Sequence, residues 1–219
     1  LAIGSNARHP NGMQTRPWDQ FTLLPQERLK WAVRDLRVFL ERDAQSWWVA
    51  HRGGEAALLR PEVERLPITA GTPDDPEPAW KRWAFGEERV CTMIRPAVPD
   101  RPLLVRTDEP CIVPPGCRAS FFFGIPVWVG INIPPKGDEV SATDMMVVPS
   151  LQLSSTWFGE LHSGLLCYAL PTTAQTNAND LDGDPLTAIC SFTVFNKSTD
   201  DLPMEKICLE ARHLAIFEG

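Results

Sequence analysis

The sequence predicts a mainly β protein, an antiparallel β-sandwich of the jelly-roll or immunoglobulin-like kind, with one N-terminal amphipathic α-helix packed on it. Three observations predict this class. Residues 119–133 are apolar at every second position, short strand-like runs alternate with turn residues from Arg89 onward, and residues 25–50 have a near-helical apolar period. Alternating rows need a core between two sheets, and we expect roughly nine to eleven strands.

The alternation in residues 119–133 is the strongest signal. Its odd-numbered row is apolar throughout and consists of Phe121, Phe123, Ile125, Val127, Val129, Ile131 and Ile133. We expect this row to face the core, so that Val129→Asp abolishes soluble expression while Asn132→Asp, on the other row, is tolerated. The even-numbered row is either covered by another layer or used for contact. Pro126 cannot donate a ladder hydrogen bond, which predicts two consecutive strands in place of one long strand.

Residues 25–50 contain the one predicted helix. Their apolar positions recur in steps of four and three, at Leu29, Val33, Leu36, Leu40 and Trp47. Pro25 suits a first helical turn, and the pair Gly53 and Gly54 would end the helix. Basic and acidic residues alternate on the opposite face, which is typical of an ordinary solvated face or of a charged partner-binding surface.

The domain organisation predicted is a tail or irregular arm over residues 1–18, followed by a single domain over residues 19–219 that includes the helix. The proline- and acid-rich segment 71–78 is interpreted as a loop, because too little chain precedes it to make an independent core.

The charge and hydropathy patterns exclude two classes of partner. The net charge is -7 and basic residues are interleaved with acidic ones, so no wide positive field for nucleic acid is expected. No apolar run approaches the roughly 20 residues of a membrane helix. Unless a signal was removed before Leu1, these features favour a cytoplasmic protein.

The six cysteines are predicted to be reduced. They form no C-x-x-C pair, and Cys190 shares an apolar row with Ala188 and Phe192, which is typical of a small core residue. A disulfide between Cys111 and Cys117, across the turn IVPPG, is the alternative.

The loop of residues 177–185 is the best candidate for a metal site, since Asp180, Asp182 and Asp184 surround Gly183. It fails the calcium-loop pattern, because Ala178 occupies the first ligand position and Ile189 stands where a bidentate glutamate is needed. A solvated turn is favoured over a cation site, and no cofactor is predicted.

Catalytic patterns are weak. Ser154, Ser155 and Thr156 precede His162, but no G-x-S-x-G motif is present. The four histidines are scattered and no glycine-rich phosphate loop follows a strand. We therefore assign no catalytic residue.

Three segments resemble a family of uncharacterised prokaryotic proteins that is known as a domain of unknown function. They are LSSTWFG (residues 153–159), GLLCYAL (164–170) and FNKSTDDLPMEKICL (195–209). The resemblance covers about residues 88–219. It implies a soluble β-domain with an accessory or binding role and gives no catalytic residue to transfer.

The aromatic residues carry the functional hypotheses. Trp128 beside Gly130 would leave a flat apolar patch, unless another layer covers it. Trp80 and Trp83 either add to an exposed platform or seal a junction in the fold. The predicted binding residues are Trp128, Phe122, Asn132, Trp80 and Trp83.

Two classes of function use these residues. The first is a non-catalytic module that contacts another protein or associates with itself. The second is a small-ligand or carbohydrate binder, or an enzyme that acts on such a ligand, with the rings as a stacking platform. The abundance of tryptophan, an interface anchor, favours the first.

Overall fold

The computed structural model describes residues 2–3, 18–54, 57–68, 79–177, 181 and 186–218. In this part the chain forms seventeen β-strands in four sheets and one 3-10 turn, Ala211–His213. The mainly β class is confirmed, with more strands than expected. None of the described helical segments is long and apolar enough to cross a membrane.

The chain divides into two compact units, and each is described by itself. Unit 1 comprises Leu1–Arg8, Ala97–Trp128 and Leu151–Gly219, and unit 2 comprises His9–Pro96 and Val129–Ser150. The single domain predicted for residues 19–219 stays a prediction. Of the predicted arm over residues 1–18, residues 4–17 lie outside the described part, whereas Ala2–Ile3 forms a strand, β1.

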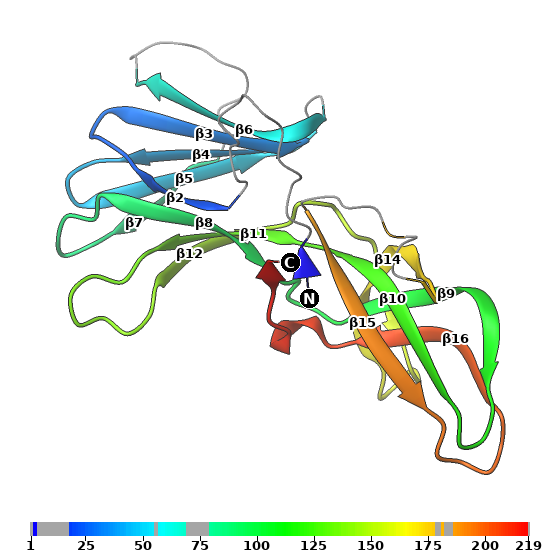
Figure 1. The fold of residues 1–219 in the computed structure, drawn as a ribbon. Helices are drawn as coiled ribbons and strands as arrows, with labels where there is room; N and C mark the ends of the chain where they lie inside the picture. The colour runs from blue at the N-terminus through cyan, green and yellow to red at the C-terminus, as the bar shows by residue number, and fades with distance from the viewer. Residues whose placement is uncertain are drawn as a thin grey trace. The chain divides into compact units, whose positions relative to one another are not determined.

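Unit 2 contains a five-stranded sheet with the order β6-β3-β4-β5-β7, in which all neighbours are antiparallel (Figure 1). Its strands are β3 (Glu27–Arg34), β4 (Leu36–Arg42), β5 (Ser46–Arg52), β6 (Leu58–Pro67) and β7 (Lys81–Ala84).

The predicted helix over residues 25–50 is wrong, because β3, β4 and β5 occupy this segment. Leu29, Trp31 and Val33 are buried at steps of two in β3, and Leu36, Val38 and Leu40 are buried at steps of two in β4. A two-residue turn separates Val33 from its partner Leu36 and shifts the parity by one. Steps of four within each strand and a step of three across the turn therefore imitate a helical period.

The residues of the turns explain why the chain reverses there. Arg34 has φ 46°, the left-handed conformation that two-residue hairpin turns need. Pro25 precedes Gln26, which has φ 65°, and the Glu27 amide donates to the Leu24 carbonyl at 3.2 Å. This is a type II turn, so Pro25 opens a turn and not a helix.

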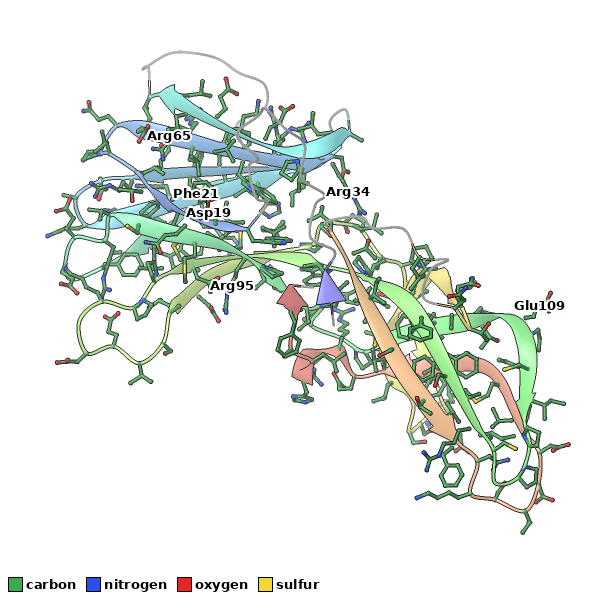
Figure 2. All side chains as sticks on the ribbon, in the orientation of Figure 1. Asp19, Phe21, Arg34, Arg65, Arg95 and Glu109 are labelled. Atoms are coloured by element: carbon green, nitrogen blue, oxygen red, sulfur yellow. The ribbon has the colours of Figure 1, made fainter. Side chains whose placement is uncertain are left out.

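The second sheet of unit 2 has the order β12-β11-β8-β2, with β2 (Asp19–Thr22), β8 (Cys91–Ala97), β11 (Trp128–Ile133) and β12 (Thr143–Val148). Val129, Ile131 and Ile133 are buried, which confirms the odd-numbered row as a core row. Phe21 of β2 is also buried, and Arg95 extends from β8 (Figure 2).

Unit 1 contains two four-stranded sheets, with the orders β10-β15-β1-β17 and β13-β14-β9-β16. Their strands are β9 (Leu103–Val113), β10 (Arg118–Pro126), β13 (Ser155–Phe158), β14 (Leu165–Ala174), β15 (Thr187–Phe195), β16 (Leu202–Leu209) and β17 (Phe217–Glu218), together with β1. β14 is parallel to β9 and β1 is parallel to β17, so these sheets are mixed and not purely antiparallel.

Residues from both sheets of unit 1 share one core. Phe121, Phe123 and Ile125 of β10 pack with Leu103 and Val105 of β9. Cys190 belongs to the same core, as its apolar row predicted. Pro126 ends β10 and Trp128 begins β11, which confirms two consecutive strands in residues 119–133.

Candidate functional site

The β13–β14 hairpin of unit 1 carries an exposed apolar surface. Trp157 is 48% exposed, Leu161 80%, Leu165 51% and Leu166 47%. We call these four residues the hairpin patch. Trp157 is paired with Leu166 and Phe158 with Leu165, so Trp157 and Leu166 share one face of the hairpin while Leu165 lies on the other. Both faces are thus apolar and exposed.

The hairpin loop holds the Trp157 ring in place. The indole N–H donates to the Glu160 carbonyl at 3.0 Å, and the Gly164 amide donates to the same carbonyl at 2.7 Å. A Cβ on Gly164 would clash with Trp157 Nε1 and with the Phe158 and Glu160 carbonyl oxygens, so the ring lies against a position that requires glycine. Gly159 has φ 100°, which also favours glycine.

Tyr168 of β14 lies against Trp128, with ring centroids 5.7 Å apart. The Tyr168 hydroxyl donates to Asp100 Oδ1 at 2.9 Å, and the Arg101 guanidinium lies 5.3 Å from the ring centroid. Burial, followed by the hydrogen bond to Asp100, raises the pKa of Tyr168. These contacts hold β14 at Tyr168, at the end of the hairpin that is distant from the loop.

Trp128, the leading binding residue predicted from the sequence, is only 6% exposed. Its indole nitrogen is buried without a hydrogen-bond partner among the described residues. Phe122 is half-buried on β10 and exchanges backbone hydrogen bonds of 2.7 Å with Gln175. The Trp128 ring is therefore not an accessible platform in this structure.

Asn132 is 1% exposed and joins three strands of unit 2. Its amide oxygen accepts from Arg95 Nε at 2.7 Å, and its amide nitrogen donates to Asp144 Oδ1. Arg95 Nη2 also donates to Asp144 Oδ1, at 2.8 Å, and Thr92 Oγ1 donates to the Asn132 carbonyl at 3.0 Å. The side-chain hydrogen bonds of Asn132 thus link neighbouring strands of the sheet.

Trp80 and Trp83 are half-buried in unit 2. Trp80 lies 6.5 Å from Phe39 between ring centroids, and the Arg28 guanidinium lies 5.4 Å from the Trp80 ring centroid. Trp83 of β7 is paired with the buried Trp47 of β5. The predicted binding residues are therefore divided between the two units.

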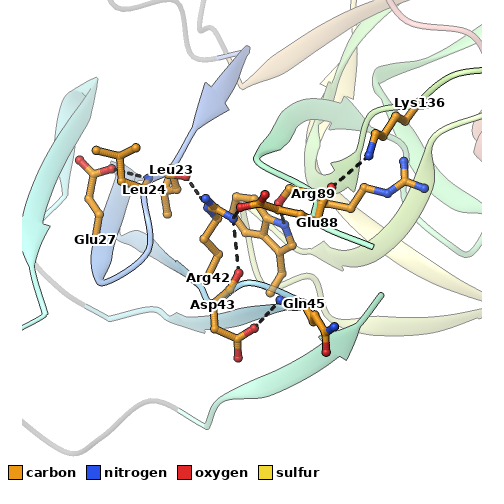
Figure 3. A network of polar contacts seen from close by, with 10 residues as sticks. Leu23, Leu24, Glu27, Arg42, Asp43, Gln45, Glu88, Arg89 and Lys136 are labelled. Atoms are coloured by element: carbon orange, nitrogen blue, oxygen red, sulfur yellow. Dashed lines mark hydrogen bonds and ion pairs between the residues drawn. The ribbon is translucent and has the colours of Figure 1, made fainter. Parts of the chain in front are cut away.

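A buried arginine organises polar contacts within unit 2 (Figure 3). Arg42 donates to the Leu23 carbonyl, to the Asp43 carbonyl at 3.4 Å and to Glu88 Oε1 at 3.0 Å. Nearby, the indole of Trp47 donates to the Arg89 carbonyl at 2.8 Å. This network joins β4 and β5 to residues 88–89 and has a structural role.

Residues 85–90 are tied to residues 136–139 by ion pairs. Arg89 pairs with Glu139 and Glu87, while Lys136 pairs with Glu87 at 2.7 Å. The hydrogen bond from Arg89, followed by one from the Lys136 amide, lowers the pKa of Glu139 to about 2.

The thiols are free at Cys111, which is half-buried, and at Cys117, which is exposed. Cys167 on β14 and Cys208 on β16 lie with their sulfurs 3.6 Å apart. Burial is the largest cause that raises the pKa of Cys208 to about 12, and the hydrogen bond with the Cys167 thiol adds to it. Within the described residues no group of three His, Cys, Asp or Glu side chains could hold a metal ion. The predicted loop with Asp180, Asp182 and Asp184 lies outside the described residues.

Comparison with known proteins gives a family. A family model described as a protein of unknown function, DUF432, matches residues 17–219. The chain belongs to this family. The match extends the resemblance predicted for residues 88–219 across unit 2, and it confirms an uncharacterised domain of unknown function. No curated protein and no solved structure matches.

Reasoning from the sequence did not identify the β13–β14 hairpin of this DUF432 chain as a site. Its two strands are formed by LSSTWFG and GLLCYAL, the segments that carry the family resemblance. The available signal was the lack of polar alternation: Leu165 and Leu166 are consecutive leucines, and Trp157 is followed by Phe158. A hairpin with apolar residues on both faces either is buried on both or presents one to a partner.

Proposed function

We propose that this DUF432 chain is a non-catalytic interaction module that docks on another protein, or on a second copy of itself, through the hairpin patch. The observation that carries the proposal is the exposure of four large apolar side chains on one hairpin. Clusters of exposed apolar side chains mark interaction sites in soluble proteins, and tryptophan is enriched among residues that dominate binding energy.

The chemistry of the patch supports contact over catalysis. Its one polar group, the Trp157 indole N–H, is already bonded to Glu160. The patch therefore offers apolar area and a fixed ring, without a free acid, base or nucleophile among its four side chains. The six free thiols support a reducing compartment, and we propose a cytoplasmic location.

The shared core of the two sheets in unit 1 supports the sandwich architecture predicted from the sequence. We extend that architecture to unit 2, whose five-stranded and four-stranded sheets each bury apolar rows. Such a scaffold would present the hairpin on a rigid support.

Binding of a small ligand or carbohydrate is the second candidate function. The observation that favours it is the half-exposed ring of Trp157, since a fixed indole can stack on a sugar. The burial of Trp128 and Asn132 weakens the platform first predicted, so Trp157 takes the place of Trp128 in this alternative.

The experiment uses the full chain and three variants. Trp157→Ala and Leu161→Ser alter the patch, and Val140→Ser is the control because Val140 is 100% exposed and lies in unit 2. We expect the wild type and the control to form a complex, either with themselves in light scattering or with a protein captured from the source cells. The patch variants should lose it.

The opposite outcome has a clear signature. Monomers that capture no protein, with tryptophan fluorescence that a sugar quenches saturably in the wild type and not in Trp157→Ala, would replace the interaction module by the ligand binder.

A further inference from the structure

We infer that two copies of this chain associate by pairing their β13 edges in antiparallel fashion, which joins two β13-β14-β9-β16 sheets across a two-fold axis. The inference rests on the proposed function and names its partner as a second copy. It starts from the position of β13 (Ser155–Phe158) at the edge of its sheet, with β14 as its one neighbour there.

The other described sheet edges carry features that oppose pairing with another chain. Natural proteins protect edges with charges, prolines, bulges or very short strands. Asp19 lies on β2, Pro61 on β6, Lys81 on β7, Arg118 on β10, Asp144 on β12 and Pro203 on β16, while β17 has two residues. A bulge also interrupts β12, and the pairing register shifts along β16.

β13 has four residues and lacks the charges, prolines and bulges of the other edges. Its sequence is STWF, without charge or proline, and its pairing with β14 is continuous over all four residues. The uncharged stretch extends from Leu151 to Gly159. Threonine and aromatic residues are favoured in strands, so this edge is suited to accept a further strand.

The position of the apolar side chains favours a second hairpin over a single extended peptide. A peptide added to β13 would cover the edge itself. Leu165 and Leu166, however, lie on the second strand, on opposite faces, and Leu161 lies in the loop. When two copies pair at β13, the apolar face that carries Trp157 and Leu166 continues onto the same face of the second hairpin, which a single added strand would not provide.

Self-pairing is also compatible with the charge pattern. The chain has a net charge of -7, yet the β13 edge has no charge that would face a like charge across the axis. In an antiparallel pair, opposed residues share a face, so a register centred on Trp157 places the two indole rings opposite each other. Cross-strand aromatic pairs of this kind stabilise sheets.

The test uses charge at the edge. Thr156 is half-buried on β13, so Thr156→Lys or Thr156→Glu places like charges on both sides of the axis, while Val140→Lys is the matched control. We expect sedimentation to show a dimer for the wild type and the control, and at least a 10-fold weaker dimer for each Thr156 variant alone. An equimolar mixture of the Lys and Glu variants should recover dimers.

Hydrogen exchange of the wild-type protein provides a readout that needs no variant. The β13 amides that face away from β14 should be protected at high protein concentration and lose protection on dilution. Exchange that is independent of concentration, or a dimer that Thr156→Lys leaves unchanged while the protein remains folded, would overturn the inference.

The two proposals can fail separately. A wild-type monomer that captures a different protein, and loses it in Trp157→Ala, would refute self-pairing and leave the interaction module in place. A monomer that captures no protein at all would refute both.

Discussion

Arg42 Nη1 lies 3.0 Å from Glu88 Oε1, and the arginine side chain is 3% exposed whereas the glutamate side chain is 57% exposed. The pair is therefore asymmetric. The arginine also donates to two backbone carbonyls, of Leu23 and Asp43, which lose a partner if the guanidinium is removed.

We expect Arg42→Ala to destabilise the protein by about 3 kcal/mol, because it leaves the buried Leu23 carbonyl without its donor and opens a gap beside Trp47. Urea unfolding measures the change. Glu88→Gln is the matched control and should cost below about 1 kcal/mol, since the carboxylate is largely in water. Equal losses in the two variants would mean that the ion pair, and not the backbone contacts, carries the stability.

Asn132→Asp should be destabilising, in contrast to the tolerance expected from sequence. The buried amide donates to Asp144, and an aspartate at position 132 would set two carboxylates against each other. We expect a loss of about 1–3 kcal/mol at pH 7, because a buried like charge replaces a hydrogen bond. The double variant Asn132→Asp with Asp144→Asn should recover part of it.

Val129→Asp tests the opposite row of the same strand. Val129 is 0% exposed, so the variant buries an unpaired charge at a cost comparable with the whole stability, about 5 kcal/mol or more. We expect loss of soluble expression at neutral pH. Soluble, folded Val129→Asp protein would show that the assignment of this row to the core is wrong.

The Glu139 carboxyl should contribute to acid unfolding. Arg89 lowers its pKa from 4.5 to about 2 in the folded protein. A depressed folded-state pKa gives stability above the unfolded-state value that is lost as pH falls through the folded-state value. Wild-type stability should therefore fall more steeply than that of Glu139→Gln between pH 4.5 and about 2, as followed by thermal unfolding. If the stability of the two proteins falls in parallel with pH, the ion pair of Glu139 with Arg89 does not contribute to acid unfolding.

Thiol labelling should separate the cysteines by environment. We expect six reactive thiols in denaturant, and a fast phase in the native protein from the exposed Cys117. The raised pKa of Cys208, about 12, keeps its thiol protonated at pH 8, so it should react slowly. Cys117→Ser should remove the fast phase. Fewer than six thiols in denaturant would restore the alternative of a disulfide between Cys111 and Cys117.

The β class and the central alternating rows were predictable because apolar residues recur at every second position in residues 119–133. The hairpins of residues 25–50 were not, since a two-residue turn at Arg34 and Asp35 shifts parity and reproduces helical spacing. Arg34 adopts a positive φ, but arginine is not among the residues that signal such a turn in a sequence. The type II turn was also not recognisable, because Gln26 follows Pro25 at the position where glycine is usual.

The candidate site was harder to predict because burial depends on the whole fold. Trp128 and Trp157 are both tryptophans in strands beside small residues, yet one is 6% and the other 48% exposed. Trp128 contacts Tyr168, which is forty residues away along the chain, and no local pattern reveals this contact.

The pairing of Ala2 with both Ile189 and Phe217 has a consequence for how the chain reaches its native state. These contacts close nearly the full length of the chain, and such loop closures slow folding because their entropy is lost before the contacts form. During synthesis from the N-terminus, β1 must wait without its strand partners until β15 and then β17 have left the ribosome. Completion of this sheet therefore follows the synthesis of β17, and one edge of β1 must remain open until then.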